Sequence, residues 1–166
     1  MEWNLATGKY GRRIVQIDDA TIVNRHFSDE PDEFHNLGEL DFTLKFSDRE
    51  FADALVNDLN EYGVGWNVKV IEPINDDDEL KMFLKVKLKY RMVNGKEVGP
   101  EIYLIDGDVK ELLNSSSIGI LQKIDIERID LDIVPYDTNK RNEPHRTAYV
   151  KTMYVVKEED RFSGRY

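Results

Sequence analysis

The segment Lys81–Arg91 carries residue types that suit contact with a polyanion. In an extended chain, alternate side chains point to opposite sides. One side is then basic around one aromatic ring, and the other is apolar apart from the Tyr90 hydroxyl. Ammonium groups about 7 Å apart along a strand can follow a phosphate backbone, and the ring can stack on a base. The basic side consists of Lys81, Phe83, Lys85, Lys87, Lys89 and Arg91.

A solvated edge strand is the alternative interpretation of the same pattern. Lysines on an exposed edge prevent association between sheets. Carboxylates on neighbouring strands can also neutralise such lysines across the sheet. The sequence alone leaves both interpretations open.

A second basic and aromatic cluster lies in residues 136–146, which we expect to form a polar loop before the last strand. Its cations suit phosphates, and Tyr136, with Tyr149 just beyond the loop, suits stacking on bases. A mobile polar loop without a ligand is the alternative. By alternation, Tyr103 shares the basic side, away from Ile102 and Leu104. From both clusters and the strands beside them, the predicted nucleic-acid contacts are Phe83, Lys85, Lys87, Lys89, Arg91, Tyr103, Tyr136, Lys140, Arg141, Arg146, Tyr149 and Lys151.

The elements that must position these residues are mostly strands. Ser47 and Glu50 form a capping-box pattern before a helix that Gly63 ends. Asn94-Gly95 predicts a tight hairpin turn after the basic strand. β-Branched residues and alternation predict the strands. We predict strands over 12–27, 41–46, 66–70, 81–92, 101–106, 129–133 and 147–157, and a short helix over 115–123.

The order of elements from Trp66 onward matches an OB-fold, a small Greek-key barrel. We therefore predict a mainly β fold (a β-rich α+β fold): an OB-like Greek-key barrel with an N-terminal β-β-α extension. Residues 1–10 would be a flexible arm, 161–166 a tail, and 11–160 a single OB-like domain. Within that domain, 11–61 would be the extension and 66–157 the barrel core.

Composition narrows the class of protein further. The net charge of −10 opposes nucleic acid when taken alone, but the positive charges are segregated along the chain. The chain contains no cysteine, which excludes disulfides, thiolate metal sites and cysteine nucleophiles. No signal peptide and no apolar run of about 18 residues is visible. We expect a cytoplasmic protein without membrane contact.

No arrangement of residues in the sequence is typical of an enzyme. His26 and His35 flank an acidic loop, which is conceivable as a metal site but lacks regular ligand spacing. Residues 76–79 lack the glycine and the spacing to a terminal glutamate that a calcium-binding loop has. Neither a glycine-rich phosphate loop nor a serine elbow is present. We predict a non-enzymatic protein with no catalytic residue, no metal and no cofactor.

A set of short segments along the chain belongs together: Gly65–Lys69, Pro100–Leu104, Ile118–Leu121, Val134–Tyr136, Ala148–Val155 and, at the N-terminal strand, Asp19–Val23 with Arg25–Phe27. These segments resemble a family of small phage-encoded proteins, described as single-stranded DNA-binding proteins of OB type. The similarity covers most of the chain, and departs from the family in the acidic loop 28–39 and in a missing tryptophan within 136–146. The resemblance implies a replication or recombination accessory in the host cytoplasm that coats single strands without sequence preference.

The first hypothesis is a non-enzymatic, sequence-independent single-stranded DNA-binding protein, with replication or recombination proteins as further partners. The sequence leaves RNA binding and a homo-oligomer open. The alternative is a phage protein-interaction module, or an inhibitor of a host enzyme, that uses its acidic surface. A metal-dependent nuclease is the third hypothesis.

Overall fold

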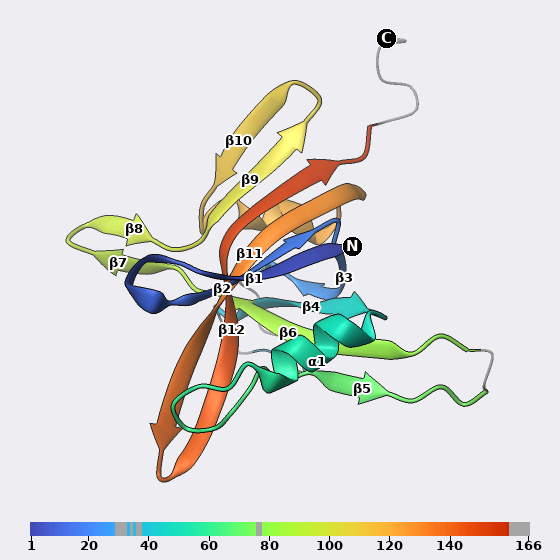
Figure 1. The fold of residues 1–166 in the computed structure, drawn as a ribbon. Coiled ribbons are helices and arrows are strands. Elements are labelled where there is room, and N and C mark those ends of the chain that lie inside the picture. Colours follow the sequence, from blue (N-terminus) through green and yellow to red (C-terminus); the bar gives the residue numbers. More distant parts are fainter. Residues whose placement is uncertain (29–32, 34, 36–37, 76–77, 160–166) are drawn as a thin grey trace.

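A large antiparallel and parallel sheet organises the chain in the computed structural model (Figure 1), which describes residues 1–28, 33, 35, 38–75 and 78–159. Its main path runs β1-β2-β11-β12-β6-β4-β3, with β5 on β6 and the β9–β10 pair on β12. The bounds of the strands in this sheet are β1 Glu2–Thr7, β2 Arg13–Asp18, β3 Thr21–His26, β4 Leu40–Phe46, β5 Lys69–Ile71, β6 Lys81–Leu88, β9 Glu101–Asp106, β10 Val109–Leu113, β11 Ile126–Lys140 and β12 Glu143–Lys157.

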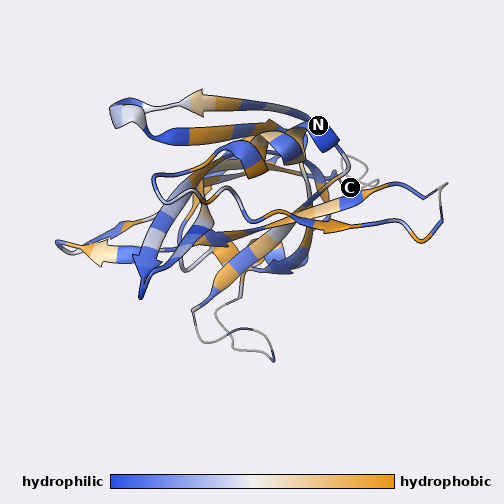
Figure 2. Ribbon diagram, turned by 60° about the horizontal axis from the view of Figure 1, so that its bottom comes forward, coloured by the Kyte–Doolittle hydropathy of each residue, from blue (hydrophilic) through white to orange (hydrophobic). Residues whose placement is uncertain are grey.

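One apolar core lies on the inner side of this sheet. Alternation gives each strand a buried set, such as Met82, Leu84 and Val86 on β6, and Figure 2 shows the hydrophobic and hydrophilic residues alternating along the strands. The helix α1 (Arg49–Asn57) and the 3₁₀ helix η2 (Ile118–Gln122) add Phe51 and Leu121 to the core. Burial of each such side chain contributes about 1.5–3 kcal/mol.

The cap of α1 lies one residue later than the capping-box pattern predicts. Asp48 is the N-cap, and its carboxylate accepts a hydrogen bond from the Phe51 amide at 3.1 Å. The helix ends at Asn57, before Leu59 and well before Gly63. Residues 58–65 instead form turns that fold back onto its end, with the Trp66 amide donating to the Leu55 carbonyl.

The N-terminal region contains more paired strand than the sequence predicts. Residues 1–10, expected as a flexible arm, contain β1, which pairs with β2 through six residues, and the 3₁₀ turn η1 (Lys9–Gly11). The strand expected over 12–27 is two strands, because Asp19 has a φ of 54° between β2 and β3. This break lets β2 pair with β11 while β3 pairs with β4.

The basic strand is shorter than expected. β6 ends at Leu88, and Arg91 opens a separate strand β7 (Arg91–Val93), paired with β8 (Lys96–Val98). The turn predicted at Asn94-Gly95 is confirmed, since both residues have positive φ. The strand predicted over 101–106 is β9, which pairs with β10 and β12 rather than with the basic strand.

The predicted polar loop 136–146 is instead the end of a long two-stranded ribbon. β11 and β12 pair as far as Lys140 and Glu143, so the turn is confined to Arg141 and Asn142, whose φ values are 55° and 59°. Figure 1 shows this ribbon extending beyond the body of the sheet. Main-chain pairing overrides the polar composition that suggested a loop.

The mainly β fold predicted from the sequence is confirmed, with α1 as the α-helix of the described residues. The sheet is not closed in the part of the chain described, since no pairing joins β1 to β3. No described helix is long and apolar enough to span a membrane. The predicted tail 161–166 and most of the acidic loop 28–39 lie outside the described residues, and the division at 61–66 stays a prediction.

Candidate nucleic-acid interface

The outer side of β6 carries the basic residues that the alternation predicts. Lys81, Lys85 and Lys87 are exposed and Phe83 is half-buried, while the side chains between them are in the core. Because β6 lies inside the sheet rather than at a free edge, the alternative of an aggregation-preventing edge strand does not describe it.

Neighbouring strands extend this basic side, which we call the basic face. Directly opposite residues of paired strands point to the same side. Phe83 lies opposite Lys45 of β4 and Lys69 of β5, so its ring sits between two further lysines that were not among the predicted contacts. The basic face consists of Lys45, Lys69, Lys81, Phe83, Lys85 and Lys87.

One carboxylate lies within the basic face. Asp41 of β4 is opposite Lys87, and its side chain is 6% exposed. It accepts from His35 Nε2 at 2.9 Å and from Lys85 Nζ at 3.4 Å, and the His35 ring stacks on His26 with centroids 3.7 Å apart. Lys85 nevertheless remains 57% exposed, so its ammonium group can still reach a ligand.

A hollow opens beside Lys85, at a gap in the sheet. On one edge of β6, β5 pairs with residues 81–83 and β12 pairs with residues 86–87. The gap between these two pairings is lined by Lys85 and Lys87, by Trp66 and Asn67, and by the start of β12. Cations and hydrogen-bonding side chains around a concave surface suit a phosphate group.

Two tyrosine pairs lie along β12, next to the basic face. Tyr149 is opposite Lys87, and its ring meets the ring of Tyr136 edge-on at 6.0 Å. Further along, Tyr154 stacks on Tyr103 of β9 with centroids 5.1 Å apart. Exposed or half-exposed rings of this kind provide stacking surfaces for bases.

A β-bulge places both tyrosine pairs on the same side. Between Asp132 and Ile133 the partner shifts from Thr152 to Val150, which leaves Lys151 as an extra residue. The buried positions of β12 accordingly change from Ala148 and Val150 to Met153 and Val155. Without the bulge, Tyr149 and Tyr154 would point to opposite sides of the sheet.

Lys110 of β10 lies over both rings of the second tyrosine pair, Tyr103 and Tyr154. Its ammonium group lies 4.4 Å from the centroid of Tyr103 and 5.0 Å from that of Tyr154. Neither Lys110 nor Tyr154 was selected from the sequence, because β10 was not predicted and the bulge inverts the alternation. The signal that could have revealed the bulge is the shift in apolar spacing after Val150.

Other predicted contacts lie away from the basic face. Lys89 follows the end of β6, and Arg91 belongs to the separate β7–β8 hairpin, so the continuous basic row over 81–91 is not formed. Lys140 and Arg141 are exposed at the end of the ribbon. Lys151 is exposed at the bulge; burial raises the pKa of Asp132, and Lys151 opposes that rise.

Arg146, predicted to hold phosphate, is directed into the protein. Its side chain is 5% exposed, and its Nε donates to Asp137 at 2.8 Å. It also donates to the Asp58 carbonyl at 2.7 Å and lies over the Trp66 ring. Its position on the inner side of β12, with Ala148 and Val150, explains this burial.

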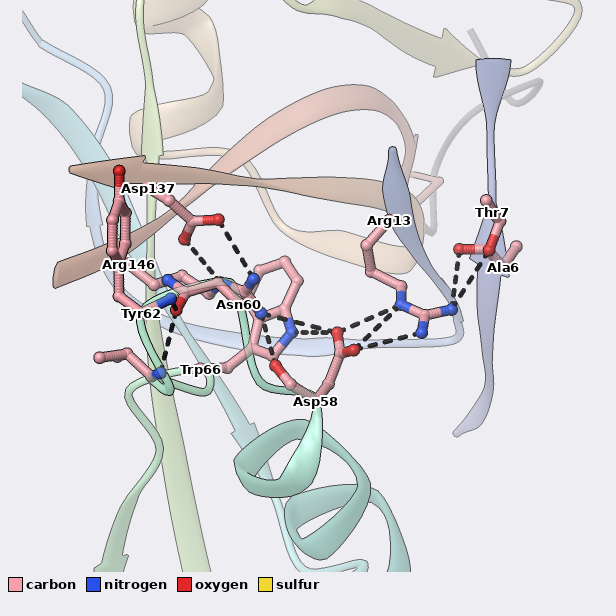
Figure 3. Close-up of polar contacts among 10 residues, drawn as sticks. Ala6, Thr7, Arg13, Asp58, Asn60, Tyr62, Trp66, Asp137 and Arg146 are labelled. Carbon is pink, nitrogen blue, oxygen red and sulfur yellow. Dashed lines mark hydrogen bonds and ion pairs between the residues drawn. The ribbon is translucent and has the colours of Figure 1, made fainter. Parts of the chain in front are cut away.

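A polar cluster centred on Asp58 fixes the ribbon against the body (Figure 3). The Asp58 carboxylate accepts from Arg13 of β2 at 3.2 Å and from the Trp66 indole at 3.0 Å, and it pairs with Arg146 at 3.6 Å. Burial raises the pKa of Asp137, but the hydrogen bonds of Arg146 and Asn60 and the charge of Arg146 outweigh it, and the pKa is lowered overall. The cluster positions the strand that carries Tyr149.

The fold and this face define a class: a mainly β domain with cations and tyrosines gathered on one side of an open sheet. The sequence profile of the family described as "Putative phage ssDNA-binding domain" matches residues 6–166. The chain belongs to this family, which confirms the resemblance found in the sequence. No match was found among curated proteins.

Solved structures share the fold. The single-stranded DNA-binding protein from bacteriophage Enc34 matches with a TM-score of 0.54 at 12% identity, covering 100% of this chain and 96% of that one. The same phage protein in complex with single-stranded DNA matches with a TM-score of 0.55 at 11% identity, covering 98% and 99%. Its C-terminal truncation gives 0.53 at 11% identity, covering 98% and 97%.

Proposed function

We propose that this protein is a non-enzymatic single-stranded DNA-binding protein that holds its ligand across the basic face and the tyrosines of β12, without sequence preference. The observation that carries the proposal is the shared side of β6 and β12, where Lys87 lies directly opposite Tyr149. A flexible single strand offers phosphates and unstacked bases together, and this side offers partners for both.

The arrangement of the groups favours a single strand over a duplex. Because of the bulge, Tyr149 and Tyr154 lie four register positions apart, opposite Val134 and Asp130 of β11, or about 13 Å at the rise of a β-strand. Bases can reach such rings only when they are unpaired and turned outward. Stacking on a ring and contact with a phosphate do not depend on which base is present, which agrees with sequence-independent binding.

We also propose that such binding serves phage replication or recombination. The negative net charge does not oppose binding to DNA, since the local basic face governs contact with phosphate.

Charge reversal on the basic face tests the proposal. The double variant Lys85→Glu, Lys87→Glu should weaken binding to labelled oligo-dT by more than tenfold in fluorescence anisotropy. Loss of two phosphate contacts should also reduce the slope of log K against log salt by about 1.4, at about 0.7 for each contact with a single strand.

A matched control is the double variant Lys96→Glu, Lys123→Glu, which makes the same charge change at two exposed lysines away from β6. It should bind within about threefold of the wild type, because only general repulsion changes. Equal losses in both double variants, or unchanged binding by the β6 variant, would contradict the proposal. Absence of oligo-dT binding by the wild type would favour the protein-interaction module.

A further inference from the structure

Tyr10, at the end of the β1–β2 hairpin, is held in a conformation that tyrosine rarely adopts. Its φ and ψ are 61° and 24°, in the left-handed region, and Gly11 follows with a φ of 73°. The other non-glycine residues with positive φ in the described chain are Asp, Asn or Arg. A bulky side chain in this region is strained.

No packing compensates for this strain. The Tyr10 side chain is 99% exposed, so its ring is in solvent. The tip is closed by main-chain hydrogen bonds, from Gly8 to the Arg12 carbonyl at 2.7 Å and from Arg12 to the Lys9 carbonyl at 3.4 Å. A glycine or asparagine would satisfy the same turn at lower cost. The folded structure therefore does not explain why position 10 is a tyrosine.

Cations flank the exposed ring. Lys9 and Arg12 are both exposed, and within the described residues no hydrogen bond or ion pair engages the side chain of Lys9, Tyr10 or Arg12. An aromatic ring between two free cations has the composition of a contact for one nucleotide, with stacking on the base and charge for the phosphates. Figure 1 shows this η1 turn projecting from the body.

The register of the sheet directs the tip toward the tyrosines of the ribbon. β2 and β11 pair antiparallel, with Val15 opposite Ile133, so the tip end of β2 leads toward the Tyr136 end of β11. Arg13, at the base of the tip, binds Asp58, which also pairs with Arg146 of β12 (Figure 3). The tip and the ribbon are thus fixed at the same end of the sheet.

We infer that the Lys9–Arg12 tip is a second contact for single-stranded DNA, in which Tyr10 stacks on a base of a strand that leaves the Tyr136–Tyr149 pair. This inference rests on the proposed function and extends it to ligands long enough to reach the tip. Backbone strain at Tyr10 is retained because the ring serves binding rather than folding.

The variant Tyr10→Gly tests the inference, because it separates binding from stability. Removal of the side chain relieves the strained backbone, so the variant should unfold at a higher urea concentration than the wild type. It should bind long oligo-dT about fivefold more weakly or worse, which is the lower end of the effect of one stacked base. An oligo-dT too short to reach the tip should bind both proteins equally.

Variants that keep an aromatic ring at position 10 serve as controls. Tyr10→Phe retains the ring and should bind long oligo-dT like the wild type, while Tyr10→Trp should show fluorescence quenching on its addition. Unchanged affinity of Tyr10→Gly, with the β6 charge reversal still damaging binding, would overturn the inference and leave the proposed function standing. If no variant, including the β6 charge reversal, loses oligo-dT binding, both the inference and the proposed function are overturned.

Discussion

At the residue scale, Arg146 and Asp137 show how the ribbon is held. Arg146 is almost fully buried, and its charge is balanced by Asp137 and Asp58. Removing one partner of such a buried pair leaves an uncompensated charge, which costs about 3–5 kcal/mol. The charge of Arg146, which in the sequence suggested a phosphate contact, therefore attaches β12 to residues 58–66.

This pair predicts a dependence of stability on pH. Since the folded-state pKa of Asp137 is lowered, its contribution is present above the unfolded value of about 3.9 and is lost as pH falls through the folded value. Asp137→Asn should therefore be less stable than the wild type at about pH 6, with the difference shrinking toward about pH 3. Urea unfolding followed by circular dichroism at several pH values measures it, and a pH-independent difference would contradict this assignment.

At the element scale, the return of the chain after α1 depends on Gly65. A Cβ at this position would lie 2.2 Å from the Val56 carbonyl oxygen and 3.1 Å from that of Leu55. Only a residue without a Cβ lets the segment approach the end of α1 this closely. The approach brings Trp66 and Asp58 together beneath the ribbon.

Gly65→Ala should lower the free energy of unfolding by about 1–3 kcal/mol, because the clash is with backbone that cannot rotate away. Gly119→Ala is the control, since its Cβ would meet its nearest neighbour, the Phe27 carbonyl oxygen, at an ordinary 3.7 Å. Denaturant titrations of both variants measure the difference. Equal stabilities would show that the segment after α1 can shift without cost.

The elements also show what the sequence could and could not predict. The alternation of β6 and the Asn94-Gly95 turn are local patterns, and both were predicted correctly. The bulge at Lys151 has no local signature beyond a shift in apolar spacing, so Tyr154 was missed. The burial of Arg146 depends on Asp58, 88 residues earlier in the chain, which no local pattern reveals.

At the scale of the whole molecule, the charge on the outer side of the sheet differs from strand to strand. Lysines from β4, β5 and β6 gather on the basic face although the net charge is −10. Asp130 and Asp132 of β11 and Asp18 of β2 lie on the far side of β12 from these lysines. A polyanion approaching the outer side of the sheet therefore meets attraction over β6 and repulsion over β2.

The measurement that tests the account most directly is an amide and side-chain NMR footprint of oligo-dT on the whole chain. The predicted perturbations lie on the outer residues of β6, β12 and β9, with the largest at Lys85, Lys87, Tyr149 and Tyr154. The outer positions of α1, such as Glu50 and Asp53, should stay unchanged. Perturbations centred on α1 or on the β7–β8 hairpin, with none on β6, would contradict the account.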